Sequence, residues 1–107
     1  MDEVFLRFEF SDGNDLEHAT RLIRERLASL DMVEEADAMP EETRLTGAEV
    51  VAAIAVTVVI VRSSRELIQE VRKLIPEIQG LIGDVRGFLK SVTAEVGTEK
   101  VQVFSKN

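Results

Sequence analysis

The chain has 107 residues, enough for one domain, and its 45% apolar and 31% charged residues are typical of a folded protein rather than a disordered one. It has no cysteine, which excludes disulfides, thiolate zinc sites and a cysteine nucleophile. Its net charge of −7 argues against nucleic-acid binding, because phosphate contacts need a basic face. The acidic residues cluster in 1–47, which suits a solvated surface, head-to-tail docking between copies, or docking onto a basic partner.

The N-terminal stretch predicts a strand followed by a helix. Apolar residues recur at every second position from Val4 to Phe10, which is typical of a half-buried strand. This stretch has neither a cationic start nor a long apolar run, so we expect no signal peptide and a cytoplasmic protein. Asn14 and Glu17 have the spacing of a capping box, and the apolar spacing after them predicts a helix to about Leu30.

The next segment predicts a second strand and a linker. Small apolar residues alternate weakly with acidic ones between Met32 and Met39, a pattern that indicates an edge strand guarded by charge. Pro40–Leu45 is polar and predicts a connection. Thr46 and Glu49 again have the spacing of a capping box, so we expect a second helix to begin there.

The stretch from Thr46 to Lys90 is interpreted as one long helical segment. It opens with twelve uncharged residues, Val50–Val61, and continues with apolar residues in three adjacent rows of a heptad. Such a stripe needs a partner surface, so we expect it to make protein–protein contacts. The predicted interaction residues along it are Val50, Ile54, Val58, Val61, Leu67, Ile68, Val71, Leu74, Ile75, Leu81, Ile82, Val85, Phe88 and Leu89.

Pro76 leaves two interpretations of this segment open. In the first, the helix ends near Ile75 and a second helix folds back as a hairpin, because proline removes a backbone hydrogen bond and clashes with the preceding turn. In the second, one kinked helix continues, which the unbroken heptad phase favours. A continuous helix would be about 65 Å long at about 1.5 Å per residue. One domain of this size could not cover it.

The apolar residues 50–61 leave three environments open: the domain's own core, an interface with other chains, or a membrane. As a helix they would span about 18 Å, whereas a bilayer core requires roughly 20 residues. Membrane insertion is therefore the alternative interpretation rather than the leading one.

The C-terminal residues predict a β-hairpin. Apolar residues alternate with polar ones from Val92 to Val96 and again from Val101, with a turn at Gly97–Glu99 between them.

The whole chain then has the order β-α-β-long α-β-β, which predicts a small α+β fold with a mixed sheet and its helices on one face. We expect one domain, composed of a strand–helix–strand half (1–45), a long helical segment (46–90) and a hairpin (91–107).

No residue set in the sequence suggests catalysis, a cofactor or a metal. His18, the only histidine, has no partner in the sequence with which to complete a site, so we interpret it as a surface residue. An acidic group lacks the ligand spacing of a calcium loop and is interpreted as a solvated or partner-facing surface. Its members are Glu34, Glu35, Asp37, Glu41 and Glu42. We therefore predict no catalytic, cofactor-binding or metal-binding residue and no enzyme activity.

The order of the predicted elements resembles the small effector-associated constant component domains of bacterial conflict systems. The resemblance is carried by the strand Val4–Phe10, the helix Leu16–Leu30, Thr46–Ala48 before an Ala/Val-rich helix running into Arg62, and the hairpin Val92–Phe104. It implies a non-enzymatic adaptor that couples a sensor to an effector, such as a protease, in an anti-phage response.

The sequence thus favours a non-enzymatic interaction module, placed in a bacterial defence system by the resemblance. It would self-associate or dock another protein through the helix 47–90, without nucleic acid. The alternative is a small membrane-active effector that inserts residues 50–61.

Overall fold

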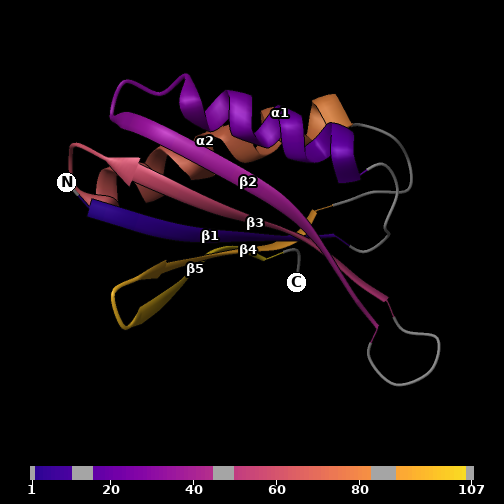
Figure 1. Cartoon of the computed structure of the whole chain (residues 1–107). Coiled ribbons are helices and arrows are strands. Elements are labelled where there is room, and N and C mark those ends of the chain that lie inside the picture. Colours follow the sequence, from indigo (N-terminus) through magenta and orange to yellow (C-terminus); the bar gives the residue numbers. More distant parts are fainter. Residues whose placement is uncertain (1, 11–15, 45–49, 83–88, 106–107) are drawn as a thin grey trace.

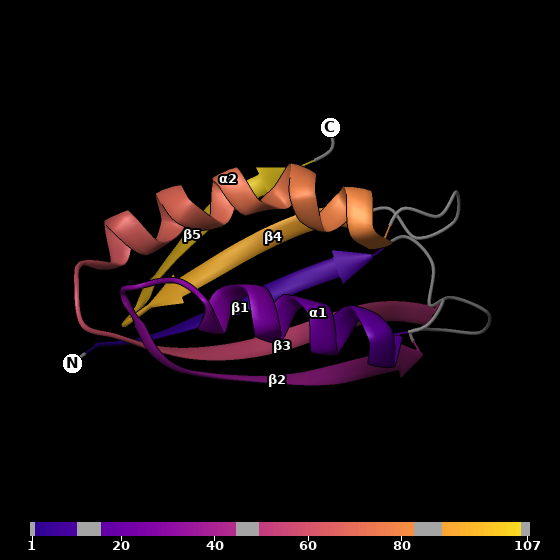
Figure 2. The same cartoon turned by 90° about the horizontal axis from the view of Figure 1, so that it is seen from above.

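Five strands and two helices make up the part of the chain that the structure, a computed structural model, describes: residues 2–10, 16–44, 50–82 and 89–105. The elements in chain order are β1 (Asp2–Phe10), α1 (Leu16–Ala28), β2 (Val33–Arg44), β3 (Val50–Ile60), α2 (Ser64–Ile82), β4 (Leu89–Val96) and β5 (Glu99–Ser105). The strands form one sheet, and both helices cover the same face of it (Figures 1 and 2). The prediction of an α+β fold is confirmed.

The sheet has the strand order β2-β3-β1-β4-β5, and all neighbouring strands are antiparallel. In each β-α-β unit a third strand separates the two parallel strands: β3 lies between β1 and β2, and β1 lies between β3 and β4. This is the split β-α-β arrangement of ferredoxin-like topology, with β5 added at one edge. The prediction of a mixed sheet is therefore wrong, because no two neighbouring strands run parallel to each other.

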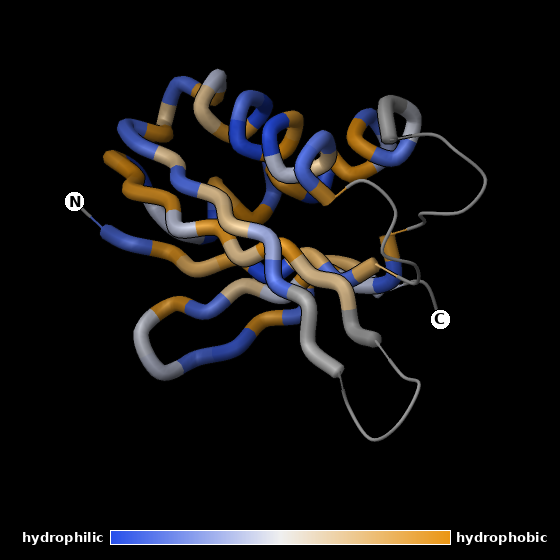
Figure 3. Tube along the Cα trace, turned by 45° about the vertical axis from the view of Figure 1, so that its right-hand side comes forward, coloured by the Kyte–Doolittle hydropathy of each residue, from blue (hydrophilic) through white to orange (hydrophobic). Residues whose placement is uncertain are grey.

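The first strand and the first helix form as predicted. The side chains of Val4, Leu6, Phe8 and Phe10 are buried on the helix-covered face of β1. Helix α1 buries one stripe at helical spacing, which includes Ala19, Ile23 and Leu27. Asn14, the predicted cap of this helix, lies outside the described residues. In Figure 3, hydrophobic and hydrophilic residues alternate along both helices, as expected for helices packed on one side.

The central strand β3 replaces the predicted first part of the long helix. Residues 50–60 pair with β1 on one side and with β2 on the other. Eight of its eleven residues are Val, Ile or Thr, whose branched side chains favour strands. One side of the strand enters the core with Ile54, Val56 and Val58, and the other carries the small uncharged residues Ala53, Ala55 and Thr57. The expectation of a helix at 50–61 is therefore wrong. None of the described helices is long and apolar enough to span a membrane.

Helix α2 is shorter than predicted and begins later. The Oγ atom of Ser63 accepts a hydrogen bond of 3.3 Å from the backbone N–H of Glu66, so Ser63 is the N-cap of this helix. The helix passes through Pro76 and reaches Ile82, which excludes a break at Ile75. Its 19 residues replace the predicted helix that extends to Lys90, and the capping pair predicted at Thr46 lies outside the described residues.

The remaining predictions concern the two edges of the sheet. Strand β2 is an edge strand, as predicted, but it continues to Arg44, so the predicted linker from Pro40 is largely strand. Proline fits there because an edge strand has one side without ladder bonds. Strands β4 and β5 form the predicted hairpin, and Gly97 in its turn has a φ of 61°, which glycine adopts at low cost.

Candidate interaction surface on the open sheet face

The structure places most of the predicted interaction residues inside the fold rather than on its surface. Buried in the core are Ile54, Val58, Leu67, Ile68, Val71, Ile75 and Leu89, and Leu74 packs against them. Val61 is 55% exposed. The side chains of Val50, Leu81 and Ile82, and all of Val85 and Phe88, lie outside the described part of the chain. The heptad stripe of α2 is thus largely covered by the chain's own sheet.

The face of the sheet opposite the helices, called the open face below, has no layer over it in the described part of the chain (Figures 1 and 2). Three rows of paired residues cross it, because strand residues alternate between the two faces. The rows are Glu41–Ala53–Glu9–Ser91, Met39–Ala55–Arg7–Thr93–Gln102 and Asp37–Thr57–Phe5–Glu95–Lys100. These rows bring together residues from all five strands.

Large apolar side chains remain exposed on this face. Phe5 is 47% exposed and Met39 is 66% exposed. Between them lie the small side chains of Ala55 and Thr57 on β3, so the surface is low along its centre. A shallow hollow of about 350 Å³ lies here, lined mainly by Phe5, Arg7, Ala55, Thr57, Thr93, Glu95 and Lys100. An exposed aromatic ring beside a hollow is typical of a contact site.

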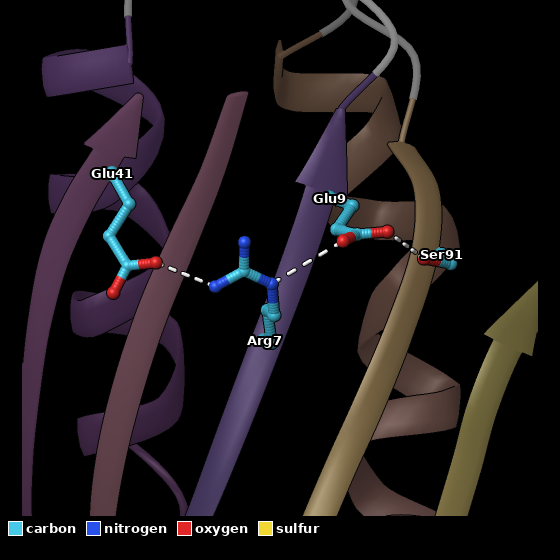
Figure 4. A network of polar contacts seen from close by, with 4 residues as sticks. All are labelled: Arg7, Glu9, Glu41 and Ser91. Atoms are coloured by element: carbon cyan, nitrogen blue, oxygen red, sulfur yellow. Dashed lines mark hydrogen bonds and ion pairs between the residues drawn. The ribbon is translucent and has the colours of Figure 1, made fainter. Parts of the chain in front are cut away.

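A network of polar side chains spans the end of the open face next to this hollow (Figure 4). The Nη1 atom of Arg7 donates a hydrogen bond of 2.6 Å to the Oε2 atom of Glu41, and its Nε atom donates one of 3.3 Å to the Oε1 atom of Glu9. The Oγ atom of Ser91 donates to Glu9 at 3.1 Å. The hydrogen bond from Arg7 to Glu41 is the main cause of a raised pKa of Arg7, so the guanidinium stays charged.

Ala53 lies beneath this network. In the register it sits between Glu9 on β1 and Glu41 on β2. Its exposed fraction is 0%, whereas Ala55, two residues later on the same face, is half-buried. We attribute the burial of Ala53 to the side chains of Glu9 and Glu41, which lie on either side of it and are both bound by Arg7. The short alanine side chain leaves space for an ion pair to cross β3 above it.

The charge of the open face is strongly negative. Its paired positions carry six carboxylates, on Glu3, Glu9, Glu35, Asp37, Glu41 and Glu95, and two cations, on Arg7 and Lys100. Arg7 pairs with two of these carboxylates. Asp37 and Glu95 have no ion pair with any described residue, although Lys100 lies opposite Glu95 on β5. The negative charge around the hollow is therefore only partly neutralised.

The structure assigns no other chemistry to the residues singled out in the sequence. Among the described residues, no group of three or more His, Asp or Glu side chains could hold a metal ion. His18 is exposed on α1, in the layer opposite the open face.

Sequence reasoning missed the open face, although Phe5 was a usable signal. It occupies a position of β1 whose neighbours two residues away, Glu3 and Arg7, are charged. An aromatic residue on the polar side of an alternating strand indicates a contact site.

Comparisons with known proteins returned no match: no family model matches the chain, and no curated protein or solved structure is significantly similar to it.

Proposed function

We propose that this protein is a non-enzymatic interaction module that binds another protein through the open face of its sheet. The observation that carries the proposal is Phe5, which is 47% exposed at the rim of the hollow over Ala55 and Thr57. Fully burying a side chain of this size is worth about 1.5–3 kcal/mol. A partner that covers the exposed half of the ring gains part of that amount.

The open face replaces the 47–90 helix of the sequence hypothesis as the contact surface. The apolar residues of α2 that point into the fold, such as Leu67, Val71 and Ile75, are already buried by the chain's own sheet. Their burial leaves little apolar surface for a second protein on residues 64–80, the part of α2 whose side chains are described. Strand β3 also occupies the place of the Ala/Val-rich helix in the resemblance to the conflict-system domains, so the proposal does not depend on that resemblance.

The fixed polar network supports a binding role for the surface beside it. Arg7 is held by two carboxylates, and Glu9 also accepts a hydrogen bond from Ser91. Side chains that are already ordered lose less conformational entropy when a partner binds. The apolar centre and polar surroundings match the usual organisation of a protein interface.

The experiment is a quantitative capture from cells of the source organism, comparing wild type, Phe5→Ala and a control variant. The control is Val61→Ala, which truncates an exposed apolar side chain in the segment where the sequence hypothesis placed the contact. We expect one protein to be retained by wild type and by the control and lost with Phe5→Ala. Its purified form should bind the Phe5→Ala variant about tenfold more weakly, or about 1.4 kcal/mol.

The result is interpretable only if the variants fold, so their thermal unfolding is compared with that of wild type. Phe5 is half-exposed, and its replacement should leave the fold intact. Equal binding of the purified partner to wild type and to Phe5→Ala would contradict the proposal. Loss of binding with Val61→Ala alone would return the contact to the 47–90 segment.

A further inference from the structure

We infer that the partner contacts the open face with two cationic side chains on either side of one apolar side chain, with the cations about 14 Å apart. The inference rests on the proposed function and specifies its partner. It follows from the row Asp37–Thr57–Phe5–Glu95–Lys100, in which two carboxylates without an ion pair to any described residue lie on either side of the exposed aromatic ring.

The spacing comes from the sheet itself. Asp37 lies on β2 and Glu95 on β4, and the strand order places β3 and β1 between them. Three strand-to-strand steps of about 4.8 Å separate the two residues by about 14 Å. The exposed Phe5 and Thr57 lie between them in the same row. A cation above each carboxylate therefore leaves a central position above Thr57 and Phe5, which both line the hollow.

An extended segment of the partner has the matching dimension. Residues i, i+2 and i+4 of a strand point to the same side, and i to i+4 spans about 13.6 Å at about 3.4 Å per residue. A segment with Lys or Arg at i and i+4 and an apolar residue at i+2 would cross the row and place its apolar side chain against Phe5.

The charges exclude two other occupants. A second copy of this chain would bring six carboxylates of one open face against six of the other, with only Arg7 and Lys100 on each side to offset them. A nucleic acid would bring phosphates to the same carboxylates. A cationic segment instead pairs with Asp37 and Glu95, which no described residue neutralises by an ion pair.

The test uses a synthetic peptide with the sequence Lys-Ser-Leu-Ser-Lys, flanked by Gly-Ser and titrated into isotope-labelled protein by nuclear magnetic resonance. Two matched peptides have Glu in place of both Lys, or Ser in place of Leu. We expect the first peptide to shift the amide signals of Phe5 and Thr57 and to bind at least fivefold more tightly than either matched peptide.

A pair of protein variants separates a specific site from general attraction to an acidic protein. Asp37→Asn with Glu95→Gln removes the two flanking charges, whereas Glu25→Gln with Glu66→Gln removes two charges from the helix layer. All four residues are exposed, so both variants should fold. We expect the first variant to bind the cationic peptide about fivefold more weakly than the second. Equal binding by the two variants would overturn the inference.

The failure of this inference can be told apart from failure of the proposed function. If Phe5→Ala abolishes binding of the natural partner while Asp37→Asn with Glu95→Gln does not weaken it, the open face binds a partner of other chemistry and the inference is wrong. If light scattering shows a dimer that Phe5→Ala dissociates, the occupant is a second copy and the inference is also wrong. If neither variant weakens partner binding, both proposals fail.

Discussion

The Nη1 atom of Arg7 lies 2.6 Å from the Oε2 atom of Glu41, so an ion pair connects β1 to β2 across the intervening β3. The two residues are 34 positions apart in the chain. The register places Ala55 beside Arg7 and Ala53 beside Glu41, and these small side chains leave room for the contact. The ion pair thus holds together three strands on the face where we place partner binding.

Replacing Arg7 with Met should destabilise the protein by about 1 kcal/mol in urea unfolding. Arg7 is about 40% exposed, so solvent screens both ion pairs and limits their contribution. The loss is larger than for a single exposed pair because the substitution removes two ion pairs, one with Glu9 and one with Glu41. The matched control is Arg26→Met, which removes the single pair with Glu77 between the helices and should cost about 0.5 kcal/mol or less.

The destabilisation caused by Arg7→Met should not change between pH 6 and pH 9. The folded state raises the pKa of Arg7, so the stabilisation from its charge is fully present at lower pH. It is lost only as the pH rises toward the pKa of arginine, far above this window. A penalty that disappears by pH 9 would contradict the assignment of the effect to the Arg7 charge.

Ala53→Leu should cost about 1–3 kcal/mol, because Ala53 is fully buried beneath the Arg7 network and a larger side chain would displace it. Ala55→Leu is the matched control, since Ala55 faces the hollow and has free space above it. We expect less than about 1 kcal/mol of destabilisation there. The control should nevertheless weaken partner binding, because the leucine would fill the hollow. Equal unfolding midpoints for the two variants would contradict the placement of the network over Ala53.

Alanine at two glycines should change the free energy of unfolding in opposite directions. A methyl group added at Gly80 or at Gly97 would meet no heavy atom within 4 Å, so crowding does not distinguish the two positions. Gly80 lies in α2, where alanine should stabilise by about 0.5–1 kcal/mol. Gly97 has a φ of 61°, where alanine should destabilise by about 1 kcal/mol. Thermal unfolding of the two variants checks the signs, and a stabilised Gly97→Ala would contradict the turn geometry.

Native-state hydrogen exchange should show that the amides of Ile54, Val56 and Val58 are among the slowest in the protein. They lie in β3, which is paired on both sides, and their side chains are buried. Amides in such positions exchange mainly by global unfolding. The edge strand β5 provides the internal comparison and should exchange faster. Rapid exchange across β3 would be incompatible with a central strand.

The sequence alone determined those helices and strands that bury one side in the core and expose the other side to solvent. In β1, apolar residues at every second position from Val4 to Phe10 predict the strand, and that pattern is confirmed. The same applies to α1, whose apolar residues recur at helical spacing, and to the β4–β5 hairpin, where Gly97 marks the turn. Each pattern records a local division between core and solvent, so neighbouring residues are sufficient to predict it.

Only the tertiary structure decided whether residues 50–60 form a helix or a strand, and where the proposed contact surface lies. An uncharged run fits a buried helix as well as a central strand, and the choice depends on β1 and β2, which supply hydrogen bonds from distant parts of the chain. The exposure of Phe5 is likewise not local, since it depends on both helices covering the other face. The ion pair between Arg7 and Glu41 exists only because the strand order places β3 between their strands.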